Sequence, residues 1–166
     1  MADERTPFDL DAYTREVQTG ECWLCRVAAH DPDYPRHYLI HESDDAIAFL
    51  NRYPTVRGAV IVAPKTHREA VIQDFPLQEY LTLQRLVWRV GRALQAVLKP
   101  ERVYVASLGS PQLTAHVHWH VIPVPPGIPP GEQQAALLDL RSGYLPLDEA
   151  EARVLATDLS MMLLAM

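Results

Sequence analysis

The sequence predicts an α+β fold, in which an antiparallel sheet carries one long helix on one face. Short segments rich in β-branched and aromatic residues come first, and turn signals separate them. One long amphipathic stretch follows, and two further segments of strand character come after it. This order predicts a strand meander, a helix and two more strands, with a helical extension at the C-terminal end. A chain of 166 residues that is 48% hydrophobic can bury one sizeable core.

Three strands are expected before the long helix, because β-branched and aromatic residues dominate short runs there. Turn signals at 43–45 and 57–58 separate these runs. An amphipathic segment at 11–18 predicts a short helix in front of them, and the prolines of 31–35 indicate a loop. The expected strands are 38–41, 46–50 and 59–63.

The long helix is expected over 76–98, since apolar residues recur there at intervals of three and four while Gln and Arg fill the other face. Asp74 and Pro76 supply the start signal, and Lys99-Pro100 supplies the stop signal. The apolar positions are Leu77, Leu81, Val87, Val90, Leu94 and Val97. The two strands that follow are expected at 103–108 and 115–122.

The C-terminal part begins with a proline-rich stretch at 123–130, which predicts an extended arm rather than packed structure. Two helices are expected after it, at 132–140 and 148–164, with the breaker 142–146 between them. Their apolar faces must be buried either on the core or on a partner subunit.

Composition excludes several classes of protein. The formal net charge of −6 opposes sequence-independent binding to nucleic acid, which needs a basic surface. No run of 18 apolar residues occurs, and the N-terminal residues are charged without an apolar stretch after them. We therefore expect a cytoplasmic protein with neither a membrane span nor a signal peptide.

Histidines occupy alternate positions in the run 116–122, at His116, His118 and His120, with bulky apolar residues in the gaps. Side chains at i, i+2 and i+4 of a strand point to one face, so three imidazoles would share a surface at a spacing of about 6.6 Å. Val117 and Trp119 favour a strand over a helix here.

Cys22 and Cys25 are the only cysteines, and two residues separate them. This spacing suits one metal ion better than a structural disulfide. A thioredoxin-like redox pair is the alternative, but that motif belongs at the strand-to-helix turn of a βαβ unit, which the surrounding sequence does not suggest. Half of a zinc site is the preferred interpretation.

The pattern His-φ-His-φ-His-φ-φ, in which φ is apolar, resembles the signature of the histidine triad family of nucleotide hydrolases and transferases. The resemblance extends from about Cys22 to Pro123 through Cys22-Trp23-Leu24-Cys25, 48–54 and 60–67, in the family's order and spacing. It implies a histidine triad domain over 1–125 with the family's antiparallel sheet. A Pro-rich arm and C-terminal helices over 126–166 would belong to the same globular unit.

Zinc-containing members of this family use the positions of His67 and His116. The resemblance therefore implies one zinc ion held by Cys22, Cys25, His67 and His116. A closed set of four ligands is structural, and such an ion would tie the N-terminal knuckle to the sheet.

In the family the middle histidine is the nucleophile, which implies that His118 attacks the α-phosphorus of a nucleotide and forms a covalent nucleotidyl-histidine. His120 would donate to phosphate oxygens and stabilise developing charge. Gln112 stands where the family has a glutamine near the α-phosphate. The family commonly has a hydroxyl residue directly after that glutamine, whereas here Leu113 stands there and Thr114 follows one place later.

Asn51 occupies the position that contacts ribose hydroxyls in the family. An asparagine there resembles the branch that cleaves diadenosine polyphosphates, while the Cys-x-x-Cys block resembles the branch that cleaves nucleoside phosphoramidates. An apolar purine pocket is expected, built from residues such as Ile40, Phe49 and Leu50. The further nucleotide-binding residues are expected to be Phe49, Ile40, Leu50, Ser107 and Thr114.

The leading hypothesis is a hydrolase or transferase that acts on a purine nucleotide or a dinucleoside polyphosphate. A metal-dependent enzyme that uses the three histidines as ligands is one alternative. A nucleotide-binding protein without significant turnover is another. Family members are usually homodimers, so the resemblance also implies a homodimer.

Overall fold

The computed structural model describes residues 4–110 and 113–166. Its centre is an antiparallel five-stranded sheet in the order β1-β2-β3-β5-β4. This confirms the α+β class predicted from the sequence. The strands are β1 (Leu39–Glu42), β2 (Ala46–Leu50), β3 (Val60–Pro64), β4 (Arg102–Ala106) and β5 (Trp119–Val124).

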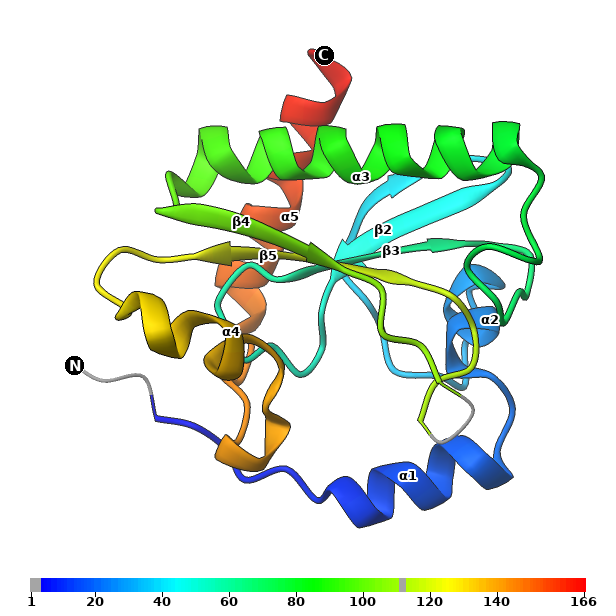
Figure 1. Cartoon of the computed structure of the whole chain (residues 1–166), viewed down its shortest axis with the longest axis horizontal. Helices are drawn as coiled ribbons and strands as arrows, with labels where there is room; N and C mark the ends of the chain where they lie inside the picture. Colours follow the sequence, from blue (N-terminus) through cyan, green and yellow to red (C-terminus); the bar gives the residue numbers. More distant parts are fainter. Residues whose placement is uncertain (1–3, 111–112) are drawn as a thin grey trace.

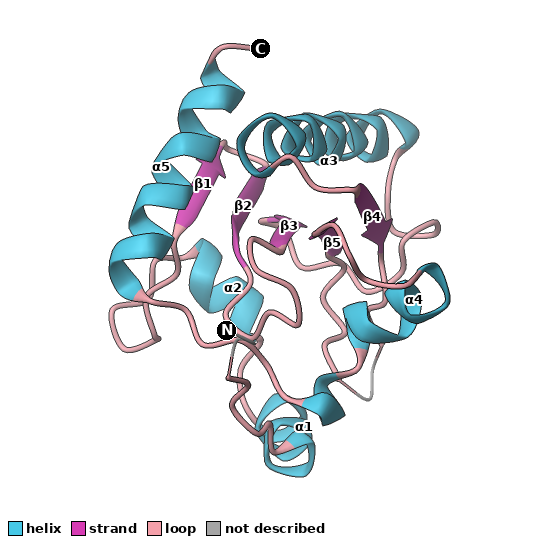
Figure 2. Ribbon diagram, turned by 90° about the vertical axis from the view of Figure 1, so that its left-hand side faces the viewer, coloured by secondary structure: helices cyan, strands magenta, loops and turns pink. Residues whose placement is uncertain are grey.

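The helices lie on both sides of this sheet and along one of its edges (Figures 1 and 2). The long helix α3 covers one face, α2 and α4 lie on the opposite side, and α5 packs against α3 and β1. The helices are α1 (Leu10–Thr19), α2 (Trp23–Ala28), α3 (Leu77–Leu98), α4 (Pro130–Leu138) and α5 (Glu149–Leu164), with a 3₁₀ turn at Leu140–Ser142. Within the described ranges, no helix has the length and apolar character that a bilayer crossing requires.

Strand β2 shows how the sheet separates two cores. Ala48 and Leu50 belong to the cluster under α3 and α5, whereas Ile47 and Phe49 belong to a second cluster that packs against α2. Successive side chains of a strand point to opposite faces, so the two sets alternate along the chain. All five residues of β2 are buried because both faces of the strand are covered.

The C-terminal helix α5 completes the core of this chain. Its apolar residues Ala152, Ala156, Leu159 and Leu163 are buried in the same cluster as the inner face of α3. The sequence left open whether the apolar face of this helix is buried on the core or on a partner subunit. In this structure these four residues are buried on the core. The smaller helix α4 adds Leu137 to a third cluster with Ile122 and Val124.

Two expectations about the end of the sheet are wrong. Strand β5 begins at Trp119 rather than at 115, so His116 and His118 precede it in irregular backbone. It also continues through Pro123 to Val124, which places the start of the expected proline-rich arm inside the sheet. Beyond Val121 this strand pairs with β4 alone, and proline is tolerated where one side of a strand lacks a partner. The arm is also shorter than expected, since α4 starts at Pro130.

Candidate active site and metal centre

Four potential metal ligands converge from three separate segments. Cys22 and Cys25 lie at the start of α2, His67 lies in the loop after β3, and His116 lies in the loop before β5. Their ligand atoms all lie within 4.8 Å of one another. The four residues predicted from the sequence as a zinc site are thus brought together.

The distances within this group suit a tetrahedral zinc ion. The Sγ of Cys22 lies 3.4 Å from Nδ1 of His116, and the Sγ of Cys25 lies 3.4 Å from Nδ1 of His67 and 3.5 Å from that of His116. Zinc at about 2.3 Å from sulfur and about 2.0 Å from nitrogen would place such atoms roughly 3.5 Å apart. These three distances therefore match the spacing of zinc ligands.

Both histidines of the cluster are oriented as metal ligands are. In each ring, Nδ1 faces the thiols and Nε2 makes a hydrogen bond to an oxygen. The partner of His116 is the Pro64 carbonyl at 3.0 Å, and the partner of His67 is the Glu69 carboxylate at 3.1 Å. Oxygen partners of this kind fix the tautomer that leaves Nδ1 free for a metal. Burial, together with the neighbouring Cys22, raises the pKa of the Cys25 thiol to about 11, a cost that a bound cation would offset.

His118 is buried and held in one orientation. Its Nδ1 lies 2.8 Å from the carbonyl oxygen of His116, to which it donates, so its Nε2 carries the lone pair. That Nε2 lies 3.2 Å from Nε2 of His120, which must then be the donor of the pair. The Oγ of Ser107 donates to the carbonyl oxygen of His118 at 2.8 Å and fixes the backbone at this point.

Both rings are neutral near pH 7. Burial lowers the pKa of His118, although the hydrogen bond to the His116 carbonyl partly opposes this change. Burial and then the proximity of His118 lower the pKa of His120 to about 3. A neutral His118 with an unprotonated Nε2 is the form that a nucleophile requires.

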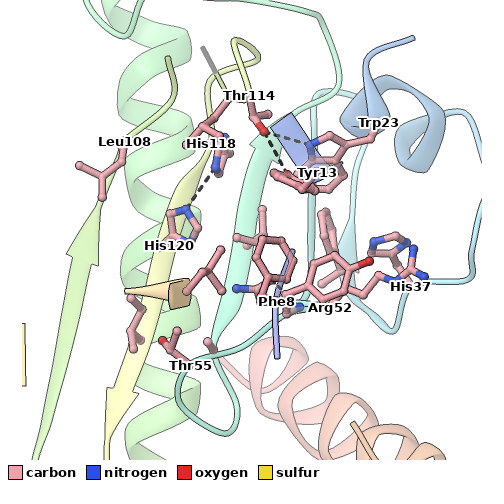
Figure 3. A pocket seen from close by; sticks show the side chains of 18 of the residues that line it. Phe8, Tyr13, Trp23, His37, Arg52, Thr55, Leu108, Thr114, His118 and His120 are labelled. Carbon is pink, nitrogen blue, oxygen red and sulfur yellow. Dashed lines mark hydrogen bonds between the residues drawn. The ribbon is translucent and has the colours of Figure 1, made fainter. Parts of the chain in front are cut away.

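His118 and His120 line a cavity of about 200 Å³ on the side of the sheet opposite α3 (Figure 3). Arg52 is its only charged side chain among the described lining residues, and no carboxylate lines it. Aromatic rings dominate the rest of the wall. They come from Phe8 and Tyr13 in the N-terminal segment, Trp23 in α2, the loop residues Tyr34, His37 and Tyr53, and Phe49 in β2.

Several rings on one side of the cavity are already arranged for stacking. His37 stacks on Trp23 with ring centroids 6.1 Å apart and on Tyr34 at 5.7 Å, while Phe49 meets His37 edge-on at 5.0 Å. Trp23 also meets His118 edge-on, with centroids 6.4 Å apart. An aromatic surface therefore lies next to the candidate nucleophile.

Three of the residues expected to bind the nucleotide line this cavity, namely Phe49, Asn51 and Thr114. The Oδ1 of Asn51 accepts from the amide of Tyr53 at 3.1 Å, which orients the side chain. The Oγ1 of Thr114 accepts from Nε1 of Trp23 at 3.1 Å.

Other expected residues lie elsewhere. Ile40 and Leu50 are buried in the cluster under α3, on the face of the sheet turned away from the cavity, and do not line it. Leu50 follows Phe49, and neighbours in a strand face opposite ways. Ser107 acts on the backbone of His118 and is not part of the wall. Gln112 lies outside the described residues.

Sequence reasoning missed the aromatic residues of the N-terminal segment. Phe8 and Tyr13 reach the cavity because the chain folds back across it, and no local periodicity marks such a contact. The position of Trp23 could have been inferred, because it lies between Cys22 and Cys25. These cysteines lie beside His116 in the ligand cluster, which brings Trp23 close to the triad.

Comparison with known proteins agrees with this arrangement. A family model, the HIT domain, matches residues 31–126. An uncharacterized HIT-like protein of Mycoplasma genitalium is 36% identical over 111 residues, which cover 63% of this chain and 74% of that protein. Another uncharacterized HIT-like protein, from Saccharolobus solfataricus, is 27% identical over 90 residues, which cover 52% of this chain and 63% of that protein.

Solved structures share the fold. A hypothetical histidine triad nucleotide-binding protein from Sulfolobus tokodaii superposes with a TM-score of 0.69 at 19% identity, covering 87% of this chain and 93% of that one. A zinc-bound histidine triad family protein from Mycobacterium smegmatis superposes with a TM-score of 0.67 at 23% identity, and the match covers 88% of this chain and 98% of that one. Since the family model spans more than half of the chain and includes all three histidines of the triad, this protein belongs to the HIT family.

Proposed function

We propose that this protein is a nucleotide hydrolase or transferase. It would attack the α-phosphate of a dinucleoside polyphosphate or a nucleoside phosphoramidate and form a covalent nucleotidyl-histidine at His118. HIT family membership supports nucleotide-binding or hydrolase/transferase activity in general. The observation that carries the specific proposal is the buried, neutral His118, whose Nδ1 donates to the His116 carbonyl and whose lone pair is on Nε2.

The proposed reaction has two displacements. In the first, Nε2 of His118 forms a bond to the α-phosphorus, and the bond from phosphorus to the leaving oxygen or nitrogen breaks with its electron pair. The leaving group takes up a proton from solvent. In the second, water attacks the same phosphorus and loses a proton to solvent, the N–P bond breaks with its electron pair returning to Nε2, and the nucleoside monophosphate leaves while His118 returns to its neutral form. Another acceptor in place of water would make the protein a transferase.

His120 is the proposed donor to the phosphoryl group. In the free protein its Nε2–H is directed at the lone pair of His118, and an entering phosphoryl group would separate the two nitrogens. The N–H would then donate to a phosphoryl oxygen, in a buried environment where such a bond is strong. Loss of one donor of this kind typically costs about 10²–10³ in kcat.

The nucleoside is proposed to bind on the aromatic side of the cavity. Trp23, His37 and Phe49 offer ring faces and edges for a purine. Asn51 is proposed to contact the ribose through its NH₂ group, because its Oδ1 is already used by the Tyr53 amide. Arg52 supplies the positive charge for an anionic ligand.

Zinc is proposed as a structural ion held by Cys22, Cys25, His67 and His116. When bound, it would supply a cross-link between α2, the loop after β3 and the loop before β5. The competing metalloenzyme hypothesis needs all three triad histidines around one ion. Among the described residues, the cluster with ligand spacing includes His116 but neither His118 nor His120, so the observation favours two separate roles.

A homodimer is proposed on the family likeness and on one exposed surface. Leu77, Leu81 and Trp88 lie along the outer side of α3 and are 72%, 47% and 62% exposed. Apolar side chains in a row are common at subunit interfaces. Light scattering of the purified protein should give twice the mass of 18.7 kDa, and a monomer at micromolar concentration would contradict this part of the proposal.

The test of function is a substrate panel with the wild type and His118→Asn. The panel contains diadenosine tri- and tetraphosphate, adenosine phosphoramidate and nucleotide sugars. Wild type should release a nucleoside monophosphate from at least one of them, and acid-quenched mass spectrometry should find a nucleotidyl adduct on His118. The variant should lose turnover by about 10³-fold or more while retaining zinc and nucleotide binding. Binding without release of monophosphate from any substrate would favour the nucleotide-binding alternative.

A further inference from the structure

The N-terminal segment, which lies outside the residues matched by the family model, is held across the cavity by several hydrogen bonds. Thr6 and Tyr144 exchange two backbone hydrogen bonds of 2.8 and 3.0 Å. The guanidinium of Arg5 donates to the carbonyl oxygens of Gly143 and Thr55, at 3.1 and 2.9 Å. Figures 1 and 2 show α1 beyond the sheet, on the side opposite α3. These contacts fix where α1 begins and therefore where its side chains enter the cavity.

Tyr13 is held by a cluster of aromatic rings. Its ring lies 5.4 Å from that of Phe8 and 6.3 Å from that of Tyr53, centroid to centroid. Phe8 in turn contacts Tyr53 at 5.0 Å and Tyr144 at 6.1 Å. Edge-to-face packing of this kind restricts the ring, so the position of the Tyr13 hydroxyl is determined by the fold rather than by a flexible side chain.

That hydroxyl meets Thr114 inside the cavity. The Oη of Tyr13 lies 3.3 Å from Oγ1 of Thr114, which also accepts from Nε1 of Trp23 at 3.1 Å. All three residues line the cavity together with His118. Figure 3 shows Thr114 beside His118, with dashed lines from Thr114 to Tyr13 and Trp23. The hydrogen-bond network of Tyr13, Thr114 and Trp23 thus lies next to the candidate nucleophile His118.

Counting protons shows what the network can offer. An indole N–H only donates, so Trp23 uses one lone pair of the Thr114 oxygen. If Tyr13 donates to the second lone pair, the Thr114 O–H has no partner within the network. If Thr114 donates to Tyr13 instead, the Tyr13 O–H has none. In either arrangement one hydroxyl proton remains for a group in the cavity.

We propose that Tyr13 is a positioning residue for phosphate recognition. Together with Trp23 it orients the Thr114 hydroxyl by donating to Oγ1, so that the Thr114 O–H donates one hydrogen bond to a non-bridging oxygen of the phosphate beside His118. This inference rests on the proposed function, because it names how that site recognises its phosphate. An anionic phosphate suits a cavity whose described lining residues include no carboxylate, and a hydrogen bond to a charged acceptor is stronger than one to a neutral acceptor.

The test compares the binding of AMP and adenosine by calorimetry, for wild type, Tyr13→Phe, Thr114→Val and the double variant. Tyr13→Phe should weaken AMP binding about fivefold and Thr114→Val about tenfold or more, and neither should change adenosine binding more than about twofold. The double variant should be no weaker than Thr114→Val, because Tyr13 acts through Thr114. Thr114→Ser should retain AMP binding.

Tyr80→Phe is the matched control, since it removes a tyrosine hydroxyl from α3, on the other face of the sheet. It should leave both affinities unchanged. Equal losses for AMP and adenosine, additive losses in the double variant, or no loss with Tyr13→Phe would overturn the proposal. None of these readouts requires turnover, so an inactive wild type would contradict the proposed function without deciding this inference. If turnover is found, kcat should fall in the same order while KM for a common substrate changes less.

Discussion

The carbonyl oxygen of His116 lies 2.8 Å from Nδ1 of His118, so a candidate metal ligand directly holds the candidate nucleophile. The same His116 ring has its Nδ1 at the two thiols and its Nε2 on the Pro64 carbonyl. The position of residue 116 therefore determines both the metal cluster and the tautomer of His118. This relationship makes the proposed structural ion relevant to catalysis without giving it a chemical step.

Removal of the metal should reduce both stability and activity. Cys25→Ser should lower bound zinc well below one per chain, lower Tm, and lower kcat by about tenfold or more, because His116 loses the partners that fix its backbone. Elemental analysis, thermal unfolding and turnover measure the three effects. His41→Gln, which removes an imidazole on β1 outside the metal cluster, should change none of them. Wild-type protein that is purified without chelator and contains no zinc would contradict the proposal.

Much of the fold followed from periodicity in the sequence. The long helix was expected at 76–98 and lies at Leu77–Leu98. Its apolar residues recur at helical spacing, and this pattern alone indicates an amphipathic helix with one face on the core. The start of β5 was not predicted correctly. Alternating residues indicate which way side chains point, but they do not show where backbone pairing with a neighbouring strand begins. Pairing of β5 with β3 begins at Trp119, opposite Val62, although β3 itself continues to Pro64.

The site was predictable where a motif marks it and not elsewhere. The four residues of the ligand cluster were named from spacing and family likeness, and the alternating spacing placed His118 and His120 on one face. Ile40 and Leu50, which the sequence suggested for the purine pocket, lie on the face of the sheet turned away from the cavity, because a shift of one residue in a strand moves a side chain to the other face. The aromatic wall contributed by Phe8 could not be predicted, since it depends on contacts between the two ends of the chain.

Asn51→Asp should separate nucleoside recognition from phosphate recognition. The aspartate can still accept from the Tyr53 amide, so the local turn and Tm should be retained. It replaces a donor by a negative charge in a cavity where Arg52 is the only charged side chain among the described lining residues. AMP binding should weaken by about tenfold while adenosine binding changes less. Calorimetry with both ligands measures this difference, and a variant that binds AMP more tightly than wild type would contradict the expected repulsion.

Gly58 is expected to tolerate no side chain. Its φ of +78° is unfavourable for other residues, and a Cβ there would lie 2.5 Å from Cδ1 of Leu98 at the end of α3. Gly58→Ala should therefore lower the free energy of unfolding by about 1–3 kcal/mol.

Two other glycines provide controls for this variant. Gly127 has a positive φ of +97°, but no atom lies within 4 Å of the position that a Cβ would take. The loss of stability in Gly127→Ala should therefore come from backbone strain alone. Gly131→Ala has neither problem and should be neutral or slightly stabilising in α4. Chemical denaturation of the three variants ranks the effects, and an equal loss for Gly58→Ala and Gly127→Ala would show that the Leu98 contact costs nothing.

The C-terminal helix should unfold together with the sheet. Leu159 in α5 is fully buried in the cluster that also contains the inner face of α3. Leu159→Ala should lower the free energy of unfolding by about 2–5 kcal/mol, the range for a buried leucine whose cavity cannot collapse. Leu164→Ala removes an 83% exposed side chain from the same helix and should change stability by less than about 0.5 kcal/mol. Denaturation followed by tryptophan fluorescence and by circular dichroism should give one coincident transition for both variants, because a single core holds the helix and the sheet. Two separate transitions would mean that 126–166 forms a unit of its own.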